Sequence, residues 1–436
     1  MSSDKQTRIS RYQQSSQWLQ RACEHIPLGS QTFSKSHIQY PSQAAPLFLT
    51  HGKGSHVWDV DGHAYVDLVN SLLAVVLGYC DPDVDAAITQ QLRSGISFSL
   101  PTTLETELAR WLTEHIPCAE MCRYAKNGTD ATSAAIRLAR AATGRDRVAL
   151  CGYHGWQDWS IGTTTRNLGI PQAVRDLSHT FPYNDLPALE NLLKQHPGQF
   201  AAVILEPMNV AYPRPGYLEG VRDLAHEHGS LLIFDEIITG FRFHIGGAQT
   251  LFGVTPDLAS IGKSMGNGMP ISAVVGKAKY MRLMEDIFFS GTFGGEALSL
   301  AASLATVKKL ERENVPARLA ATGQKIADAF EAMTAKYQLQ DVIKLAGHPA
   351  WKIMQFVDHP HATLWEIKSL YLQELIAGGV LSIGSHNVSF SHDESDIQKI
   401  IQAQDHALRT VRDALQADDL LSRLNGPPIQ PLFRVR

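Results

Sequence analysis

An acidic pair and a lysine are the residues of this chain whose types and settings are best suited to chemistry. Asp235 and Glu236 end the apolar run SLLIFDEI, and Lys263 lies in the glycine-rich stretch GKSMGNGMP. A carboxylate at the carboxyl end of a buried strand stands where α/β sheets bind ligands. There, Asp235 would keep a pyridine nitrogen protonated and make that ring an electron sink. A partly desolvated lysine near a tight turn is suited to Schiff-base chemistry, although alone it would be read as a surface lysine.

A nucleotide site is a second interpretation of the same residues. Gly262-Lys263-Ser264 looks like the end of a phosphate-binding loop, and Asp235-Glu236 looks like the second signature of an ATPase. The loop needs a glycine five positions before Gly262, however, and Asp257 stands there. The lysine also follows the acidic strand, which reverses the usual order. These two departures argue against an ATPase.

Two further segments could bind a flat, phosphorylated ligand. In KNGTDATSAAIRLAR, Gly128 and Thr129 begin an alanine-rich helix, whose free N–H groups and positive end form a phosphate cup. Simple capping of the helix by Asn127 or Thr129 is the alternative. In CGYHGW, Tyr153 could stack on a cofactor ring beside His154. A core tyrosine with a hydrogen-bonded histidine would explain the same segment.

Taken together and in order, six segments resemble the class III aminotransferases, which are pyridoxal-phosphate enzymes of fold type I. Within that family the sequence resembles the glutamate-1-semialdehyde 2,1-aminomutases and their look-alikes in sugar or secondary metabolism. The resemblance runs from about residue 25 to 400. The segments that carry it are NGTDATSAAIRLAR, GYHGW, ILEP, IFDEIITGFR, PDLASIGKSMGNGMP and SGTFGGEALSLAA.

This resemblance implies a role for each motif around pyridoxal 5'-phosphate. Lys263 would form the Schiff base with the cofactor and move protons at the substrate carbon, while Asp235 would pair with the pyridinium nitrogen. Tyr153 and Ile237 would pack on the two faces of the ring. The other implied cofactor contacts are Asn127, Gly128 and Thr129 at the phosphate, His154 beside the ring, Glu206 and Asn209 on the hydroxyl side, and Thr292 at a phosphate of the neighbouring subunit.

The substrate region departs from the aminomutase pattern. Lys35 falls where the aminomutase has a carboxylate-binding arginine, and a lysine cannot reproduce a bidentate fork. Trp156 adds a bulky aromatic side chain, and His386 stands where the aminomutase has an acidic patch. The glycine- and threonine-rich stretch 160–179 is expected to be either a gating loop that carries Arg166 to the substrate or a solvated loop. These differences predict that the cofactor is retained and the substrate is changed.

The leading functional prediction is therefore an aminotransferase that moves an amino group between a small polar or anionic amine and a carbonyl compound. An aminomutase would use the same cofactor residues, and so would a pyridoxal-phosphate-dependent ammonia-lyase. A cofactor-binding regulator would require a DNA-binding region, for which the sequence offers no basic segment. The resemblance also implies a homodimer with shared active sites.

Alternation of helical and apolar segments predicts the fold class. The apolar, β-branched runs RVALCGY, AAVILEP, SLLIFDEI and SAVVGKA are typical of strands buried on both faces of a parallel sheet. We expect an α/β protein with a large cofactor-binding domain over 71–305. The helices and the alternating stretches WKIMQFVD and NVSFSHD after 305 predict a smaller α+β domain over 306–436, completed by residues 1–70.

Composition sets limits on partners and location. The net charge of −4 offers no basic surface for nucleic acid, and no apolar run is long enough to span a membrane. The five cysteines are sparse, and Cys118 and Cys122 have no second ligand pair with metal-site spacing. We therefore expect small-molecule substrates, no metal and a cytoplasmic location.

Overall fold

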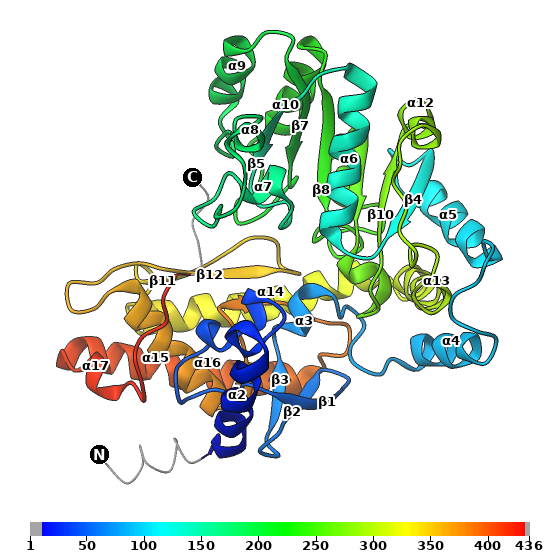
Figure 1. The fold of residues 1–436 in the computed structure, drawn as a ribbon. Helices are drawn as coiled ribbons and strands as arrows, with labels where there is room; N and C mark the ends of the chain where they lie inside the picture. Colours follow the sequence, from blue (N-terminus) through cyan, green and yellow to red (C-terminus); the bar gives the residue numbers. More distant parts are fainter. Residues whose placement is uncertain (1–10, 432–436) are drawn as a thin grey trace. The chain divides into compact units, whose positions relative to one another are not determined.

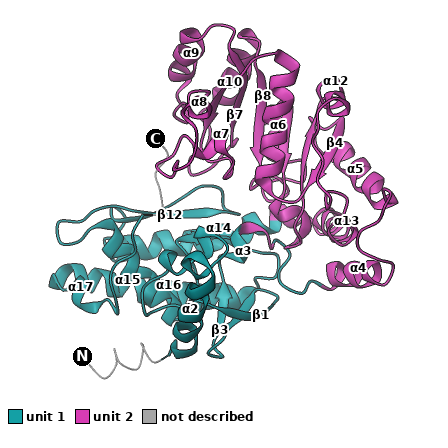
Figure 2. Ribbon diagram, viewed as in Figure 1, with its two compact units in different colours: residues 1–72, 76–81, 318–432 teal, residues 73–75, 82–317, 433–436 magenta. Residues whose placement is uncertain are grey.

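The computed structural model describes residues 11–431, which form two compact units (Figure 1, Figure 2). Residues 1–10 and 432–436, at the ends of the expected segments 1–70 and 306–436, lie outside the described residues. None of the described helices is long and apolar enough to cross a membrane. The described residues of unit 1 are 11–72, 76–81 and 318–431, and those of unit 2 are 73–75, 82–317.

Unit 2 is built on a seven-stranded sheet in the order β4-β10-β9-β8-β7-β5-β6. Strands β6, β5, β7, β8 and β9 run parallel, and β10 is antiparallel to both of its neighbours. This sheet confirms the predicted α/β class with a mostly parallel sheet. Its strands are β4 (Met121–Ala125), β5 (Arg147–Cys151), β6 (Ser178–Thr180), β7 (Phe200–Leu205), β8 (Leu231–Glu236), β9 (Leu258–Ile261) and β10 (Ser272–Gly276).

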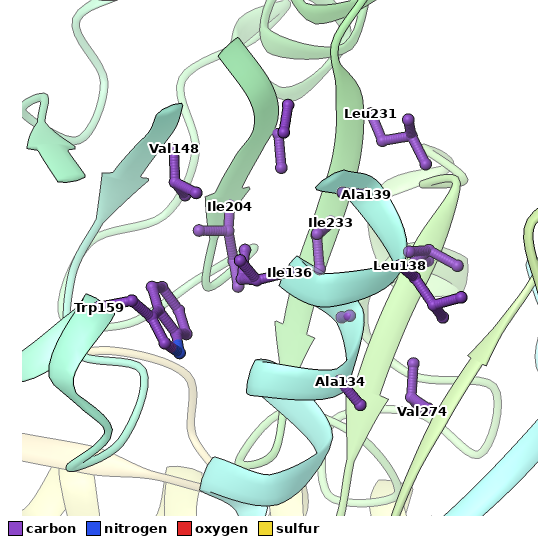
Figure 3. Packing of buried hydrophobic residues seen from close by; sticks show 14 of the residues in the cluster. Ala134, Ile136, Leu138, Ala139, Val148, Trp159, Ile204, Leu231, Ile233 and Val274 are labelled. Atoms are coloured by element: carbon purple, nitrogen blue, oxygen red, sulfur yellow. The ribbon is translucent and has the colours of Figure 1, made fainter. Parts of the chain in front are cut away.

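The centre of this sheet is covered on both faces, which explains its apolar sequence. Every residue of β7, β8, β9 and β10 is buried. Helix α6 (Gly128–Thr143) packs across β7, β9 and β10, and its alanines allow close approach to the sheet. Figure 3 shows Ile136 and Leu138 of this helix among the side chains of the strands. The packing fixes the start of α6 beside the carboxyl ends of the strands.

The other helices of unit 2 flank the sheet or follow its strands. They include α13 (Ala297–Arg312), which packs on α4 and α5 and lies wholly within unit 2, although the expected boundary at 305 divides it. The remaining helices are α4 (Pro82–Leu92), α5 (Thr103–His115), α7 (Asp158–Ile161), α8 (Gln172–Arg175), α9 (Leu186–Gln195), α10 (Tyr217–Glu227), α11 (Ala248–Phe252), α12 (Ala278–Met281) and the 3₁₀ turns η4 (Lys263–Gly266) and η5 (Arg282–Glu285).

Unit 1 combines the two ends of the chain. One sheet has the order β1-β2-β3-β13 and the other the order β11-β12-β14. Its strands are β1 (Leu49–Lys53), β2 (His56–Asp59), β3 (Ala64–Asp67), β11 (Ile343–Ala346), β12 (Lys352–Phe356), β13 (Val380–Leu381) and β14 (Ser385–His386). Its helices are α2 (Gln13–His25), α14 (Val315–Lys336, from residue 318 on), α15 (Leu364–Ala377), α16 (Glu394–Ala417), α17 (Leu420–Arg423) and the short turns η1 (Pro27–Gly29), η2 (Phe33–Lys35) and η3 (His37–Gln39).

One expected extended segment of unit 1 is not a strand. The alternating stretch 387–393 follows β14 as irregular chain. Its polar groups bind other loops of the unit, since the Asn387 amide N–H donates to the Leu68 carbonyl and the Phe390 N–H to the Val76 carbonyl, at 3.0 and 2.8 Å. Alternation alone therefore did not distinguish a strand from a loop whose apolar residues are buried.

The chain crosses from unit 1 to unit 2 through a left-handed turn, α3 (Asn70–Leu73). Asn70, Ser71, Leu72 and Leu73 have φ angles of 46°, 49°, 58° and 75°. None of the four is a glycine, so each side chain is strained in this conformation. Hydrogen bonds from the Asn70 side chain to the carbonyls of Asp67 and Asn387 help to hold the turn.

Candidate active site

A pocket of about 270 Å³ lies at the carboxyl ends of the central strands of unit 2. Its titratable side chains include Glu206 directly after β7, Asp235 in β8 and Lys263 shortly after β9. Parallel neighbours in the sheet bring these residues together although they are far apart in sequence. The other lining residues are Asn127, Gly128, Thr129, Thr132, Tyr153, His154, Gly155, Trp156, Ile237 and Ile238.

Asp235 is buried and held by two neighbours. The Ile237 N–H donates to its Oδ1 at 3.1 Å, and His154 Nδ1 lies 2.8 Å from its Oδ2. His154 Nε2 lies 3.1 Å from the Cys151 carbonyl, which can only accept, so Nε2 carries a proton. Its Nδ1 bonds the Asp235 carboxylate, so His154 ties that carboxylate to the backbone at Cys151.

Lys263 occupies a strained position at the start of η4. Its φ angle is 39°, in the left-handed region that disfavours a side chain. Burial lowers the pKa of its ammonium, the charges of Asp235 and Glu206 oppose that shift, and the charge of Arg242 adds to it. The site therefore favours the neutral, nucleophilic amine more than water does.

Glu206 is the second carboxylate of the pocket. Burial and the neighbouring charge of Asp235 raise its pKa to about 7, while His154, Asn209 and Lys263 work in the opposite direction. The Asn209 side-chain amide donates to Glu206 Oε2. Two carboxylates that share a confined pocket resist simultaneous ionisation, so Glu206 can hold a proton at neutral pH.

The start of α6 forms one wall of the pocket. Asn127 caps the helix, with its N–H donating to Asp130 Oδ2 at 2.8 Å. The following amides, of Gly128 and Thr129, belong to the first turn, where N–H groups have no partner within the helix. The Thr129 hydroxyl oxygen is buried and makes no hydrogen bond with the described residues. These donors are placed to hold an anion at the positive end of the helix.

Glycines keep this wall open. A Cβ at Gly128 would lie 2.9 Å from Ile237 Cγ2, and one at Gly155 would lie 2.3 Å from the Thr129 hydroxyl oxygen. Gly155 also has a φ angle of 110°, which side chains rarely adopt. Both glycines are therefore required by the close packing of the loops around the start of α6.

Aromatic side chains border the mouth of the pocket. Tyr153 is 45% exposed and Trp156 is 64% exposed, so both offer ring surface to a ligand. Burial of its remaining surface raises the pKa of Tyr153. Trp159, in contrast, packs in the core, stacks on His154 with the rings 9° from parallel, and donates to Ser133 Oγ at 2.9 Å.

Five of the expected site residues lie outside this lining, and one of them, Asn209, reaches it only through its hydrogen bond to Glu206. Thr292 borders a second pocket of unit 2, of about 370 Å³, beside Lys126 and Arg137. Arg166 is exposed on the segment 160–179, which is partly regular because it contains α8 and the start of β6.

The other two are in unit 1. Lys35 is exposed and donates to Ser71 Oγ at 3.4 Å. His386 is fully buried in β14, with its Nε2 2.9 Å from the Gln404 side-chain amide. Its ring faces the core of unit 1, so His386 no longer belongs among the candidate substrate residues. The signal that suggested it, a difference from the aminomutase pattern, carries no information about burial.

Sequence reasoning missed two residues beneath the lysine. Arg242 is fully buried, and its Nη2 donates to the Leu73 carbonyl at 3.4 Å. Ser264 Oγ donates to the same carbonyl at 3.2 Å. Ser264 was considered only as part of the discarded ATPase motif, and no sequence signal separates a buried arginine from an exposed one. The described residues contain no cluster of three or more His, Cys, Asp or Glu placed to hold a metal ion.

Comparison with known proteins assigns the chain to a family. The family model described as "Aminotransferase class-III" matches residues 38–404. The chain is 36% identical to the 3-aminobutyryl-CoA aminotransferase of Cloacimonas acidaminovorans, over 85% of this chain and 91% of that protein. It is 38% identical to the glutamate-1-semialdehyde 2,1-aminomutase of Roseiflexus castenholzii, over 85% and 92% of the two chains.

Solved structures agree with this assignment. The FumI protein of Sphingopyxis sp. MTA144, in its PLP internal aldimine form, has a TM-score of 0.87 at 28% identity, over 92% of this chain and 97% of that one. An omega-transaminase from Sphaerobacter thermophilus has a TM-score of 0.82 at 29% identity, over 91% and 98% of the two chains. The chain therefore belongs to the class III aminotransferases, enzymes of fold type I that depend on pyridoxal phosphate.

Proposed function

We propose that this protein is an aminotransferase that exchanges an amino group between a small polar or anionic amine and a carbonyl compound. The observation that carries the proposal is the meeting of Lys263, Asp235 and the first turn of α6 around one pocket. A primary amine, a buried carboxylate and an anion-binding helix end match the three reactive parts of pyridoxal phosphate. These parts are its aldehyde, its ring nitrogen and its phosphate.

The residues of the pocket fit this cofactor. Pyridoxal phosphate, when bound, supplies an aldehyde that condenses with amines and a protonated ring that withdraws electrons. The Gly128 and Thr129 amides and the unpartnered Thr129 hydroxyl would hold the phosphate. Asp235 would hold a proton at the ring nitrogen, and Tyr153 and Ile237 would pack on the ring. His154 would orient Asp235, and Glu206 with Asn209 would lie on the hydroxyl side.

Lys263 would form the covalent bond to the cofactor and would also transfer protons. Its Nζ would hold the cofactor by condensing with the aldehyde, which releases water, and it would be freed when a substrate amine takes its place. As a free amine, Lys263 would then take up a proton from the substrate carbon and return it. The lowered pKa of Lys263 supports both tasks, because each requires the neutral form.

The related aminomutases suggest a second candidate function. Intramolecular transfer would use the same cofactor residues, and a relative with that name is 38% identical to this chain. A lyase that expels ammonia would also use them. We favour the aminotransferase because Lys35 replaces the arginine of the aminomutase pattern, while Lys35, Trp156 and Arg166 remain the candidate substrate contacts.

We also propose that the working enzyme is a homodimer. Phe288 and Phe293 are 85% and 59% exposed, and they flank Thr292 on one loop of unit 2. Covering such apolar side chains is favourable. A second copy on this surface would bring its Thr292 toward the phosphate of the first.

Two experiments test the assignment. Purified protein with pyridoxal phosphate should show a visible absorbance band, and reduction with borohydride should attach the cofactor to Lys263. Lys263→Ala should lose the attachment, whereas Lys308→Ala, at an exposed lysine of α13, should keep it. Attachment that survives in Lys263→Ala would rule out the proposed role.

Substrate screening separates the three activities. An aminotransferase should convert the bound cofactor to pyridoxamine phosphate when an amine donor is added alone, and a carbonyl acceptor should reverse the change. An aminomutase should isomerise its substrate without an added acceptor. A lyase should release ammonia and leave the absorbance of the cofactor unchanged. Amino acids, amino sugars and aminophosphonates form a suitable panel.

A further inference from the structure

Asn127 and Gly128, at the start of α6, are a chemically reactive pair. In an Asn–Gly sequence the backbone nitrogen of the glycine can attack the side-chain carbonyl carbon of the asparagine, because glycine has no side chain to block the approach. The chain has such pairs at 127–128, 267–268 and 425–426. Among them, only 127–128 stands where an α-helix begins. Its surroundings therefore differ from those of the other two pairs.

The side-chain amide of Asn127 is accessible and weakly held. Asn127 is exposed, and its Nδ2 donates to one described group, Asp130 Oδ2, at the long distance of 3.4 Å. Asn425 offers a contrast, because it is only 8% exposed and its N–H donates to Gln373 Oε1 at 2.9 Å. The side-chain nitrogen of Asn127 can therefore leave toward water, whereas Asn425 is enclosed by packing.

The first turn of α6 favours attack at Asn127 by stabilising the charge that the attack creates. Addition of the Gly128 nitrogen to Asn127 Cγ places negative charge on the side-chain oxygen. The N–H groups without helical partners and the positive end of the helix stabilise an anion at the capping position. The Thr129 hydroxyl, which makes no hydrogen bond with the described residues, is a further donor in this turn. The features that suit the turn to a phosphate therefore also suit it to this reaction.

Packing keeps the reactive glycine in place. A Cβ at Gly128 would lie 2.9 Å from Ile237 Cγ2 and 3.1 Å from Ile237 Cδ1. Ile237 is itself fixed, because its N–H donates to Asp235 Oδ1 at 3.1 Å. A larger residue at position 128 would therefore push against the segment that holds the buried carboxylate. The Asn–Gly pair is thus part of the construction of the pocket wall.

We propose that Asn127 is a deamidation site, and that an anion bound at the start of α6 protects it. The Gly128 nitrogen bonds to Asn127 Cγ, the bond from Cγ to Nδ2 breaks, and ammonia leaves with the proton that the glycine nitrogen gave up. A five-membered cyclic imide remains. One water molecule then opens the imide at either of its carbonyl carbons. The product is aspartate or isoaspartate at position 127, and no oxidant or reductant is required.

The product places a carboxylate where the phosphate of the cofactor is expected. The new charge would also face Asp130, whose Oδ2 lies 3.4 Å from the present amide nitrogen. We therefore expect deamidated protein to bind pyridoxal phosphate about tenfold more weakly. Conversely, a phosphate held by the Gly128 N–H occupies the nitrogen that must attack. This link to the cofactor rests on the proposed function, whereas the deamidation itself belongs to the cofactor-free protein.

The test is to store cofactor-free protein at mildly alkaline pH and to follow the conversion of amide to acid by peptide mass spectrometry. The peptide that contains Asn425 is the internal reference. Asn127 should convert faster than Asn425, and saturating pyridoxal phosphate should slow the conversion at Asn127 and leave that at Asn425 unchanged. Inorganic phosphate should also slow it, because it fills an anion site without forming a Schiff base.

The outcomes separate this inference from the proposed function. Conversion at Asn127 that is no faster than at Asn425, or that neither anion slows, would overturn the inference. Protection by inorganic phosphate but not by pyridoxal phosphate would support the inference and count against the proposed function.

Two variants connect the modification to cofactor binding. Freshly purified Asn127→Asp should bind pyridoxal phosphate about tenfold more weakly than the fresh parent protein, as the stored parent should. Asn127→Ser keeps a residue suited to cap a helix but has no amide to lose, so its affinity after storage should equal its affinity when fresh. Equal losses of affinity on storage in Asn127→Ser and in the parent would place the damage at another residue and contradict the proposal.

Discussion

Asp235 has acceptor capacity left after its two hydrogen bonds. Each carboxylate oxygen can accept more than one donor, and Oδ1 and Oδ2 each have one partner among the contacts described above. His154 holds the carboxylate through Oδ2, and Asp235 still lines the pocket. A protonated ring nitrogen can therefore take the remaining position without displacing either neighbour.

The substitution Asp235→Asn tests whether Asp235 binds a protonated ring nitrogen. The amide has the same shape but cannot hold a proton at the ring nitrogen, so we expect kcat to fall about 10²- to 10³-fold with nearly unchanged folding. Asp257→Asn is the matched control, because Asp257 is also buried and lies 2.8 Å from a histidine, His226, away from the pocket. Steady-state kinetics with the best amine donor measures the difference. Equal losses in the two variants would show a purely structural effect.

Glu206 predicts a pH-dependent stability of the cofactor-free protein. Its pKa of about 7 lies above the ordinary value of 4.5, so the folded state binds this proton more tightly than the unfolded state. Stability from this group is therefore present below pH 4.5 and is lost as pH rises through 7. Glu206→Gln should be more stable than the parent protein above pH 7, by roughly 1–3 kcal/mol, and nearly equal at pH 5.

Urea unfolding from pH 5 to 8.5 measures that difference. Glu219→Gln, at an exposed glutamate of α10, should follow the parent protein across the range. A Glu206→Gln curve that runs parallel to the parent at every pH would contradict the prediction.

At the residue scale, the site residues that could be predicted are those that lie in a continuous sequence motif. Lys263, Asp235 and Thr129 each follow or begin a recognisable element, and the structure gathers them in one pocket. Arg242 was not predicted, because no motif indicates its burial or its hydrogen bond to the Leu73 carbonyl. His386 was misjudged, because its burial depends on packing against residues such as Gln404.

At the scale of elements, the first turn of α6 depends on the glycine loop that follows β5. Gly155→Ala should weaken pyridoxal-phosphate binding at least tenfold, because its Cβ would displace the Thr129 hydroxyl. Gly144→Ala is a strict control. Gly144 also has a positive φ angle, but nothing lies within 4 Å of its Cβ position. Fluorescence titration with the cofactor measures both variants.

Only Gly155→Ala should bind the cofactor more weakly, because only its added Cβ collides with Thr129. Both variants carry the cost of a side chain at positive φ, about 1–2 kcal/mol in stability. Similar cofactor affinities for Gly155→Ala and Gly144→Ala would show that the wall at Thr129 does not hold the phosphate.

The strands that could be predicted are those whose apolar sequence pattern matches their burial in the structure. The runs that became β5, β7, β8 and β10 are continuous and apolar, which suits strands covered on both faces. The turn α3 could not be foreseen. Its sequence, NSLL, contains no glycine, and the carbonyls of Asp67 and Asn387 that help to hold its left-handed geometry come from other parts of the chain.

At the scale of the whole molecule, the exposed phenylalanines predict the assembly. The native mass in solution should be about twice 48.0 kDa, and Phe288→Asp should shift it toward the monomer and lower the cofactor affinity. Leu421→Asp alters another exposed apolar residue, on α17, and should remain dimeric. Analytical ultracentrifugation distinguishes the two. If Phe288→Asp remains dimeric, the dimer interface must lie on another surface.

Unit 1 combines an early and a late part of the chain, so it cannot be completed until most of the chain has been synthesised. Strand β13, from the last part of the chain, pairs with β3, from the first part, and the described residues of unit 2 are encoded between them. At a translation rate of roughly 5–20 residues per second, the strands β1 to β3 wait on the order of tens of seconds for their partner. During that interval unit 2 can fold, while the edge of β3 stays unpaired. A nascent chain stalled before residue 380 should therefore depend most on chaperones that shield exposed strand edges.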